Sequence, residues 1–310
     1  MILFLGKRIA YMALTMVAVS LIVFLLLELS PGSVATKVLG PYSSEEQRQL
    51  WLVAHGYAEP VWMRYFLWLL RFVTGDFGES LLYKAPVADV LWPRLRNTAI
   101  LGAATLAVMV PLALTLGVLA GMREGSSLDR TISVTSVVTT SVPEFASAVL
   151  FSAVLVFWLK LLPGTSTMSN GFEWQQLALP VLVLVVYDMG YIARMTRASM
   201  VEVMTMPYIR TAILKGLPHW RVIVSHALRN ALIAPFTVIM LQVNWLLSGV
   251  IVVEFFFAYK GFGALLLEAS LNKDVYLIEA CTMVAVFVAV ASQTLADLAY
   301  AYLNPRIRFS

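Results

Sequence analysis

The sequence predicts an all-α integral membrane protein with six transmembrane helices. Of its 310 residues, 60% are hydrophobic and 13% are charged, whereas soluble domains carry about 45–50% apolar and about 25% charged residues. Six apolar segments are each long enough to cross a bilayer as a helix, which takes about 20 residues. They cover residues of about 9–29, 98–121, 132–159, 177–194, 231–253 and 279–303. Residues 1–310 are therefore expected to form a single membrane-spanning domain.

The first apolar segment follows Lys7 and Arg8, as the core of a signal peptide also would. This run is about 20 residues long, enough to span, and no small-residue cleavage site follows it. An uncleaved transmembrane helix is expected.

Residues 31–97 form the one long external segment. Ser44, with Gln47 three residues later, predicts a capped helix start, and Gly56 predicts the end of that helix. Pro60 predicts the start of a second helix, with an apolar stripe that could lie on the membrane surface or pack on other helices. The stripe contains Trp62, Phe66, Leu69, Leu70 and Val73, and Gly75-Asp-Phe-Gly-Glu-Ser80 after it predicts a turn.

The third and fourth apolar segments differ in length. The third is long and is interrupted by Pro143 and Glu144, and proline in a helix removes a backbone hydrogen bond and bends the axis. A kink is expected there. The fourth segment, 177–194, is short for a span.

Lysine and arginine are divided unequally between the two sides of the membrane. Cytoplasmic loops carry an excess of these residues. With the N-terminus inside, the inside segments hold twelve of them, and the short outside loops hold only Lys160, Lys260 and Lys273. Both termini are therefore expected in the cytoplasm. The other seven lie in residues 31–97, a loop longer than about 60 residues, where the rule loses force.

The loop at about 204–222 is basic and contains a short apolar stripe. Pro207 suits the first position of a helix and Gly216 suits its end. Ile209, Ala212, Ile213 and Gly216 fall at i, i+3, i+4 and i+7, on one face of that helix. A helix of about two turns is marginal in water by itself. We expect the stripe to lie on another protein that drives this chain by moving the helix.

Polar residues within the apolar segments are candidates for a transport pathway, because polar groups in hydrocarbon usually face a cavity or a partner. Glu144 follows the helix-breaking proline, and Asp188 lies inside the fourth segment, where a contact with Arg194 is the alternative. Gln242 and Asn244 are further candidates, with polar contact between helices as the alternative. Three other acids fall near segment ends, where a structural role is favoured: Glu28, Glu254 and Asp297.

No enzyme or metal motif is present in the sequence. His219 and His226 are seven residues apart and share a helix face, but two histidines without a third ligand are a weak metal signal, and His55 lies far away in sequence. Cys281 lies in an apolar stretch and is expected to be a small buried hydrophobic residue. The net charge of +4 comes from loops beside the spans, which favours membrane topology over nucleic-acid binding. The sequence also contains no nucleotide-binding motif, so a transporter of this kind would take its energy from a partner.

Several motifs occur in a fixed order over nearly the whole chain. The longest are Arg194-Met-Thr-Arg-Ala-Ser-Met-Val-Glu-Val203, Tyr208-Ile-Arg-Thr-Ala-Ile-Leu-Lys-Gly-Leu217 and Arg221-Val-Ile-Val-Ser-His-Ala-Leu-Arg-Asn-Ala-Leu232. Shorter ones are Leu29-Ser-Pro-Gly32, Gly75-Asp-Phe-Gly78, Leu128-Asp-Arg130, Ser141-Val-Pro-Glu-Phe145, Val252-Val-Glu254 and Asn304-Pro-Arg-Ile-Arg308. Together they resemble the membrane permease subunits of bacterial ABC importers, in the oligopeptide/dipeptide/nickel branch.

This resemblance implies a type I ABC importer permease fold in the bacterial cytoplasmic (inner) membrane. It implies a second homologous permease, two ATPase domains that bind ATP and Mg, and an extracytoplasmic substrate-binding protein. The permease itself would hold no cofactor and catalyse no reaction. The coupling loop to the ATPase would comprise Tyr208, Ile209, Arg210, Thr211, Ala212, Ile213, Lys215, Gly216 and Leu217.

The chain departs from the family pattern in this loop. Ile213 and Leu214 replace a basic residue and a small one, and Pro218-His-Trp-Arg221 stands where Ser-Glu-Arg-Arg is common. The resemblance implies peptides or peptide-like solutes as substrates, with nickel chelates, glutathione, opines or oligosaccharides as alternatives within the branch. A secondary carrier or channel that works alone is the alternative from another class, and an intramembrane enzyme is disfavoured.

Overall fold

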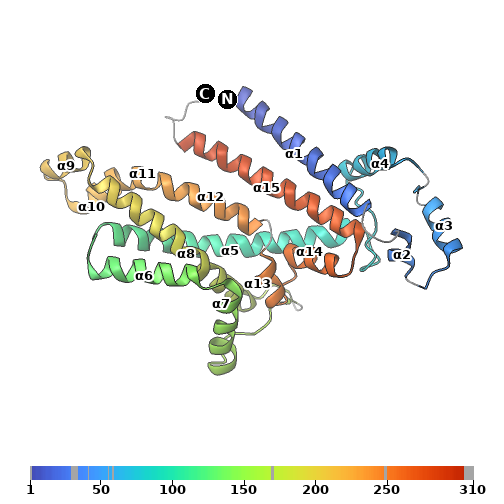
Figure 1. The fold of residues 1–310 in the computed structure, drawn as a ribbon. Helices are drawn as coiled ribbons and strands as arrows, with labels where there is room; N and C mark the ends of the chain where they lie inside the picture. The colour runs from blue at the N-terminus through green and yellow to red at the C-terminus, as the bar shows by residue number, and fades with distance from the viewer. Residues whose placement is uncertain are drawn as a thin grey trace. The chain divides into compact units, whose positions relative to one another are not determined.

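The chain is almost entirely helical in the computed structural model, which describes residues 2–28, 34–40, 42–54, 56–57, 59–168, 171–247 and 250–303 (Figure 1). Four helices are long and apolar enough to span a membrane, and two bent helix pairs raise the number of candidate spans to six within the described residues. The predicted all-α membrane fold is confirmed. The motifs Leu29–Gly32 and Asn304–Arg308, and also His55, lie outside the described residues.

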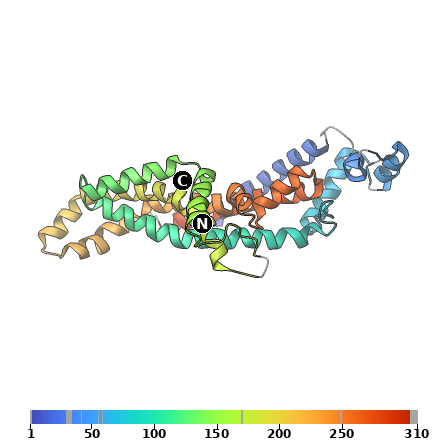
Figure 2. The ribbon, with the colours of Figure 1, turned by 90° about the horizontal axis from the view of Figure 1, so that it is seen from below.

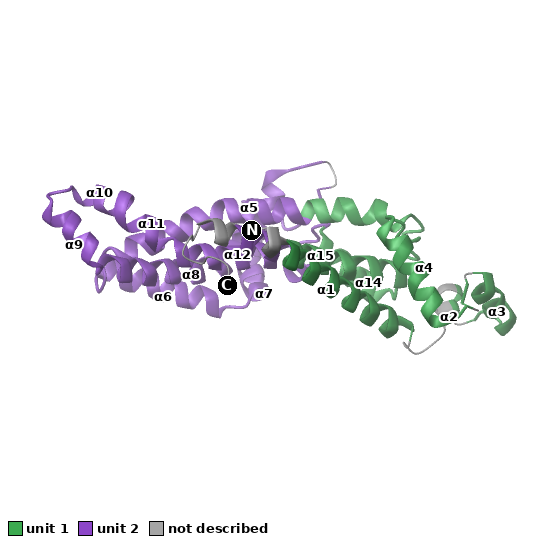
Figure 3. Cartoon of the chain, turned by 90° about the horizontal axis from the view of Figure 1, so that it is seen from above, with its two compact units in different colours: residues 1–97, 261–291 green, residues 98–260, 292–310 purple. Residues whose placement is uncertain are grey.

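The sequence predicted one membrane domain, and the structure separates two compact units within it (Figure 3). Unit 1 contains residues 1–97 and 261–291, and unit 2 contains residues 98–260 and 292–310. Two long helices contribute to both units, α5 (Val87–Gly121) and α15 (Val275–Leu303).

Unit 1 contains the first span and the external helices. These are α1 (Ile2–Glu28), α2 (Val34–Leu39), α3 (Glu45–Ala54), α4 (Val61–Val73) and α14 (Phe262–Leu271), with the first turns of α5 and most of α15. Its core forms where α5 meets α14 and α15, through Val87, Leu91, Phe262, Leu265, Ala269, Leu277, Ala280, Cys281 and Val284. The sequence analysis assigned no helix to residues 262–271, which are apolar but too short to span.

The helix signals in the external segment are confirmed. Ser44 and Gln47 cap α3 reciprocally, since each backbone N–H donates to the other residue's side chain, at 3.0 and 3.2 Å. Gly56 has φ +76° after the helix, and the Tyr57 N–H donates to the Leu52 carbonyl at 2.8 Å. In the turn after α4, Gly75 and Gly78 both have positive φ, and the Asp76 carboxylate accepts from the Gly78 N–H at 3.1 Å.

Unit 2 contains the remaining helices, whose bounds follow. They are α6 (Ser127–Ser141), α7 (Glu144–Phe151), the π-helix η1 (Ser152–Trp158), α8 (Trp174–Met204), α9 (Pro207–Leu214), α10 (His219–Val222), the π-helix η2 (Ile223–Ala227), α11 (Leu228–Ala231), α12 (Ile233–Leu247) and α13 (Ile251–Phe256). Helices α6 and α8 lie side by side (Figure 1). Their contact requires Gly190, since a Cβ there would lie 2.4 Å from the Ser136 carbonyl oxygen.

Two predicted spans differ from the helices observed. The kink expected at Pro143 is a full break, because α6 ends at Ser141 and the chain turns by 101° into α7. The segment predicted at 177–194 is not short, because α8 continues to Met204. Arg194 and Arg197 end the apolar run but not the helix, since a helix can continue from the membrane into water.

Candidate functional site

The loop that follows α8 folds as a helical hairpin at one end of unit 2 (Figures 1 and 2). Pro207 occupies the first position of α9, where its missing N–H leaves no bond unmade. Gly216 adopts φ +74°, and the Leu217 N–H donates back to the Ala212 carbonyl at 3.4 Å. The predicted helix start and stop are therefore both present, and α10 and η2 lead the chain back into α11.

The inner face of α9 packs against the chain's own helices. Ile209 is 0% exposed and Ala212 is 6% exposed. Both belong to an apolar cluster whose other buried members are Met200, Val203, Val222, Ile223, Ala227 and Ala231. The prediction that the whole stripe lies on another protein is wrong for Ile209 and Ala212, because the end of α8 and the returning η2 cover them. These two residues instead fix α9 to the helix before it and the helix after it.

The outer face of α9 carries the remaining loop residues. Leu214 is 79% exposed, Ile213 is 53% exposed, and Trp220 beyond the turn is 66% exposed. Tyr208 is exposed with its hydroxyl held by the Asn230 amide, which donates to it at 2.8 Å. Arg210, Thr211, Lys215 and Gly216 are exposed and Leu217 is half-buried. We call Ile213, Leu214 and Trp220, with the basic Arg210 and Lys215, the hairpin surface.

The sequence analysis missed Leu214 and Trp220 as candidate contact residues. The sequence analysis chose contact residues by helical spacing, which places positions 209, 212, 213 and 216 on one face of the helix. Leu214 lies off that spacing and Trp220 lies beyond the helix. Their departure from the family pattern was the available signal, because large apolar residues there replace small or charged ones.

An ion pair joins the end of α8 to the start of α6. The Arg197 guanidinium donates to both carboxylate oxygens of Asp129, each at 2.8 Å, and Asp129 is only 3% exposed. Asp129 also accepts from the Gly125 N–H at 2.9 Å. A bidentate pair of this kind fixes both distance and orientation. It therefore ties the helix that precedes the hairpin to a second candidate span.

The candidate pathway residues divide into two groups. Gln242 on α12 donates to Asp188 on α8 at 2.7 Å, and this amide, rather than Arg194, is the partner of Asp188. Glu144 at the start of α7 is close enough for its charge to act on Asp188. Asn244, on α12 as well, accepts a hydrogen bond from Ser292 on α15 at 2.9 Å. The structure thus joins Asp188 to Gln242 directly and places Glu144 within electrostatic range of Asp188.

This polar cluster is incompletely bonded. One carboxylate oxygen of Asp188 and one of Glu144 are buried without a hydrogen-bond partner in the described part of the chain. Buried polar atoms are usually bonded, so the cluster can accept further hydrogen bonds from a ligand or water. The three acids near span ends have protein partners: Glu254 accepts from Thr98 at 2.5 Å, Glu28 pairs with Arg64, and one carboxylate oxygen of Asp297 accepts from Gln293 at 3.3 Å.

No three potential metal ligands among His, Cys, Asp and Glu come together in the described residues. Cys281 is buried in the core of unit 1.

Comparison with known proteins gives consistent results at three levels. The family described as "Binding-protein-dependent transport system inner membrane component" matches residues 113–309. The "Oligopeptide transport system permease protein AppB" of Bacillus subtilis is 31% identical over 301 residues, 95% of each chain. The "Dipeptide transport system permease protein DppB" of Escherichia coli K12 is 31% identical over 337 residues, 99% of each chain.

The fold also resembles a solved membrane transporter. A chain of the MetNI methionine ABC transporter, in an inward-facing conformation, superposes with a TM-score of 0.54 at 15% identity. The match covers 70% of this chain and 96% of that one. At this identity the similarity concerns the fold alone.

Proposed function

The chain belongs to the binding-protein-dependent transport system inner membrane component family, and from this membership we propose that it forms half of the translocation pore of an ATP-driven importer of peptides or peptide-like solutes. The observation that carries the proposal beyond membership is the hairpin surface. Leu214, Ile213 and Trp220 are large apolar side chains exposed at the end of a helix pair that is itself rigidly packed.

In this proposal, α9 is a coupling helix, and its packing against both α8 and η2 attaches it to the spans. Its inner residues Ile209 and Ala212 attach it to α8 and η2, so a force on its outer face moves those helices with it. The Asp129–Arg197 pair passes the movement on to α6. Closing and opening of the ATPase dimer would then tilt the spans between outward-open and inward-open states.

The partners follow from the same proposal. A second homologous permease completes the pore, two ATPase domains bind ATP and Mg and dock on the two coupling helices, and an extracytoplasmic binding protein delivers the substrate. This chain catalyses no reaction. The lysine and arginine bias supports cytoplasmic termini in a bacterial inner membrane.

The polar cluster of Asp188, Gln242 and Glu144 is the proposed pathway-lining site. Its two unbonded carboxylate oxygens lie in candidate spans, where ionisable groups usually mark a substrate route. Asn244 was predicted to share this role, but its bond to Ser292 favours a contact between helices.

The substrate class rests on the relatives. Both relatives described above are named as permeases of peptide transport systems. Their names support peptides as the substrate over nickel chelates, glutathione, opines or oligosaccharides. Identification of the ligand carried by the binding protein that co-purifies with the complex distinguishes these alternatives.

The central test is Leu214→Asp in the complete transporter, reconstituted in proteoliposomes with both permeases, the ATPases and the substrate-loaded binding protein. A charge at a central apolar contact costs about 2 kcal/mol or more, so ATPase association should weaken by about thirtyfold or more, with loss of ATP-driven uptake. Leu50→Asp on α3, at 65% exposure, is the matched control and should retain uptake. Normal ATP-driven uptake by Leu214→Asp would refute the docking role.

A second measurement addresses the carrier or channel alternative. The purified chain, reconstituted without ATPase subunits, should show no uptake under an imposed proton or sodium gradient. Gradient-driven uptake by the chain alone would favour the secondary carrier instead.

A further inference from the structure

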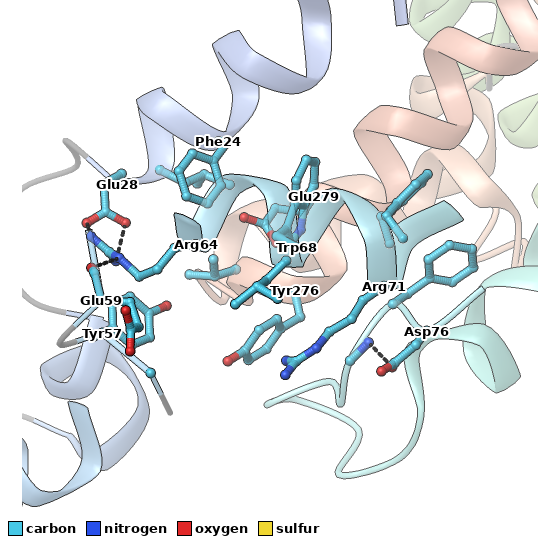
Figure 4. A pocket seen from close by; sticks show the side chains of 18 of the residues that line it. Phe24, Glu28, Tyr57, Glu59, Arg64, Trp68, Arg71, Asp76, Tyr276 and Glu279 are labelled. Carbon is cyan, nitrogen blue, oxygen red and sulfur yellow. Dashed lines mark hydrogen bonds and ion pairs between the residues drawn. The ribbon is translucent and has the colours of Figure 1, made fainter. Parts of the chain in front are cut away.

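Unit 1 contains a cavity of about 540 Å³ that the proposed transport cycle does not use (Figure 4). Its walls come from the end of α1, the loop before α4, one side of α4, the turn that follows it, and the start of α15. This volume lies within the range of about 300–1,000 Å³ typical of small-molecule sites.

The cavity lies at the boundary of the membrane-spanning part of α1. The candidate span ends at Glu28, and the cavity wall includes both Glu28 and Phe24. Four residues of helix correspond to about 6 Å along the axis. Helix α4 runs beside this end, with the Tyr65 hydroxyl 2.8 Å from the Ser20 hydroxyl. The cavity therefore extends from the level of the helix end about 6 Å into the apolar run, at the depth of lipid headgroups.

One charge pair in the cavity wall is already satisfied. Arg64 donates to both carboxylate oxygens of Glu28, at 2.9 and 2.6 Å, and its Nε donates to the Glu59 carbonyl at 3.2 Å. Its guanidinium also lies over the Tyr57 ring, 4.8 Å from the centroid. Arg64 and Glu28 thus have little capacity left for a ligand.

Four other charged residues line the wall without an ion-pair partner in the described part of the chain: Glu59, Arg71, Asp76 and Glu279. Glu279 is only 7% exposed, and the Trp68 indole N–H is its hydrogen-bond donor. Neither Glu279 nor Arg71 at the rim forms an ion pair within the described residues. A buried carboxylate is costly unless a cation or further donors stabilise it. The cavity therefore offers the Glu279 carboxyl group at its inner wall and the Arg71 guanidinium at its rim, neither of them in an ion pair.

The rings around Glu279 suit a positively charged group. Phe24, Tyr57, Trp68 and Tyr276 line the same cavity. Burial raises the pKa of the Tyr57 hydroxyl, and the nearby Tyr276, Glu279 and Glu28 raise it further, so these acidic groups converge on one space. Aromatic faces beside a carboxylate are the chemistry that recognises an ammonium group.

We propose that this cavity binds the headgroup of a phospholipid with a primary ammonium group, the ammonium on Glu279 and the phosphate on Arg71. Apolar surface for the acyl chains is present on the same two helices, because Leu67 lines the cavity and is exposed, and Leu25 and Leu26 on α1 and Leu70 on α4 are exposed as well. A peptide, which is also a zwitterion, would have no use for this apolar surface.

The test uses the full-length chain in nanodiscs that contain equal amounts of phosphatidylethanolamine and phosphatidylglycerol. After transfer to detergent, native mass spectrometry measures which lipid stays bound. The wild-type chain should retain phosphatidylethanolamine at least severalfold over phosphatidylglycerol. Glu279→Gln, which keeps the shape and the bond to Trp68, should abolish this preference. Arg71→Gln changes an exposed side chain and should weaken retention of both lipids without affecting folding.

Glu45→Gln on α3 is the control, since it removes the same charge in the same unit outside the cavity. An unchanged lipid preference in Glu279→Gln together with undiminished lipid retention in Arg71→Gln would overturn the proposal, as would equal retention of the two lipids by the wild-type chain. Displacement of the bound lipid by a millimolar dipeptide would identify a peptide site instead. None of these results depends on ATP-driven uptake, so they stand apart from the test of the transport role.

Discussion

Two amphipathic helices, α9 in unit 2 and α4 in unit 1, differ in whether their predicted apolar residues are buried within the chain or exposed. In α9 half of the predicted stripe turns inward, with Ile209 and Ala212 in the cluster formed with η2, while Ile213 and Gly216 are exposed. In α4 the predicted stripe turns outward, and Trp62, Phe66, Leu70 and Val73 are all exposed. An apolar stripe thus shows that a helix has a face to cover, but the surrounding elements decide whether the same chain covers it.

The difference is explained by what each helix has beside it. The chain after α9 returns through α10 and η2 and supplies Val222 and Ile223 as a cover. Helix α4 places Tyr65, Trp68 and Arg64 toward α1 and the cavity. Its other side, which carries the exposed Trp62, Phe66, Leu70 and Val73, is left for the surroundings, which beside a membrane span means lipid or a partner subunit.

The largest effect in this comparison is expected at Ile209. Ile209→Ala should lower the free energy of unfolding by about 2–5 kcal/mol, because it removes a fully buried side chain from a packed cluster. Ile213→Ala, one turn further on the exposed side, should stay within about 0.5 kcal/mol. Thermal unfolding of the purified chain in detergent measures both. Equal effects at the two positions would show that α9 is not packed as described.

The ion pair of Arg64 with Glu28 should have the next largest effect, on the α4 side of the comparison. Arg64→Gln removes three hydrogen bonds and leaves the Glu28 carboxylate partly buried, so a loss of about 1.5–3 kcal/mol is expected. The exposed pair of Arg48 with Glu45 is the reference, and Glu45→Gln should cost about 0–1 kcal/mol. The same unfolding measurement applies, and a smaller loss for Arg64→Gln than for Glu45→Gln would contradict the geometry of the pair.

The spans and the helix ends could be predicted from local sequence, but the site could not be predicted completely. Pro207, Gly216 and Ser44 start or end a helix through backbone contacts within one turn. Their effect on helix ends can therefore be predicted from the local sequence. The orientation of Ile209 depends on η2, and α9 is apolar at 213 and 214 as well, so periodicity alone did not identify the inner face. The cavity brings together residues near 24–28, 57–78 and 275–280, and no local pattern connects segments so far apart.

A smaller effect is expected at Gly216, where α9 stops. Gly216→Ala places a side chain on a residue with φ +74° but in open space, so only backbone strain results. That strain is about 1–2 kcal/mol for an L-residue in the left-handed region. Gly216→Asn should cost less than alanine, because asparagine tolerates this conformation. The order glycine, asparagine, alanine in melting temperature checks the prediction, and an alanine variant as stable as wild type would exclude a left-handed stop.

The smallest effect on the stability of the isolated chain is expected on the outer side of α4. This prediction compares the same variant in detergent and in nanodiscs. Leu70→Gln should change the unfolding free energy in detergent by no more than about 0.5 kcal/mol, because Leu70 touches little of its own chain. In nanodiscs the same change places an amide where the structure leaves an exposed apolar surface, so the melting temperature should fall. Gln49→Leu, an apolar change on the exposed side of α3, is the converse control and should alter neither value. A Leu70→Gln melting temperature that is equally unchanged in nanodiscs would mean that lipid does not cover α4, and that its outward stripe faces water or awaits the partner permease.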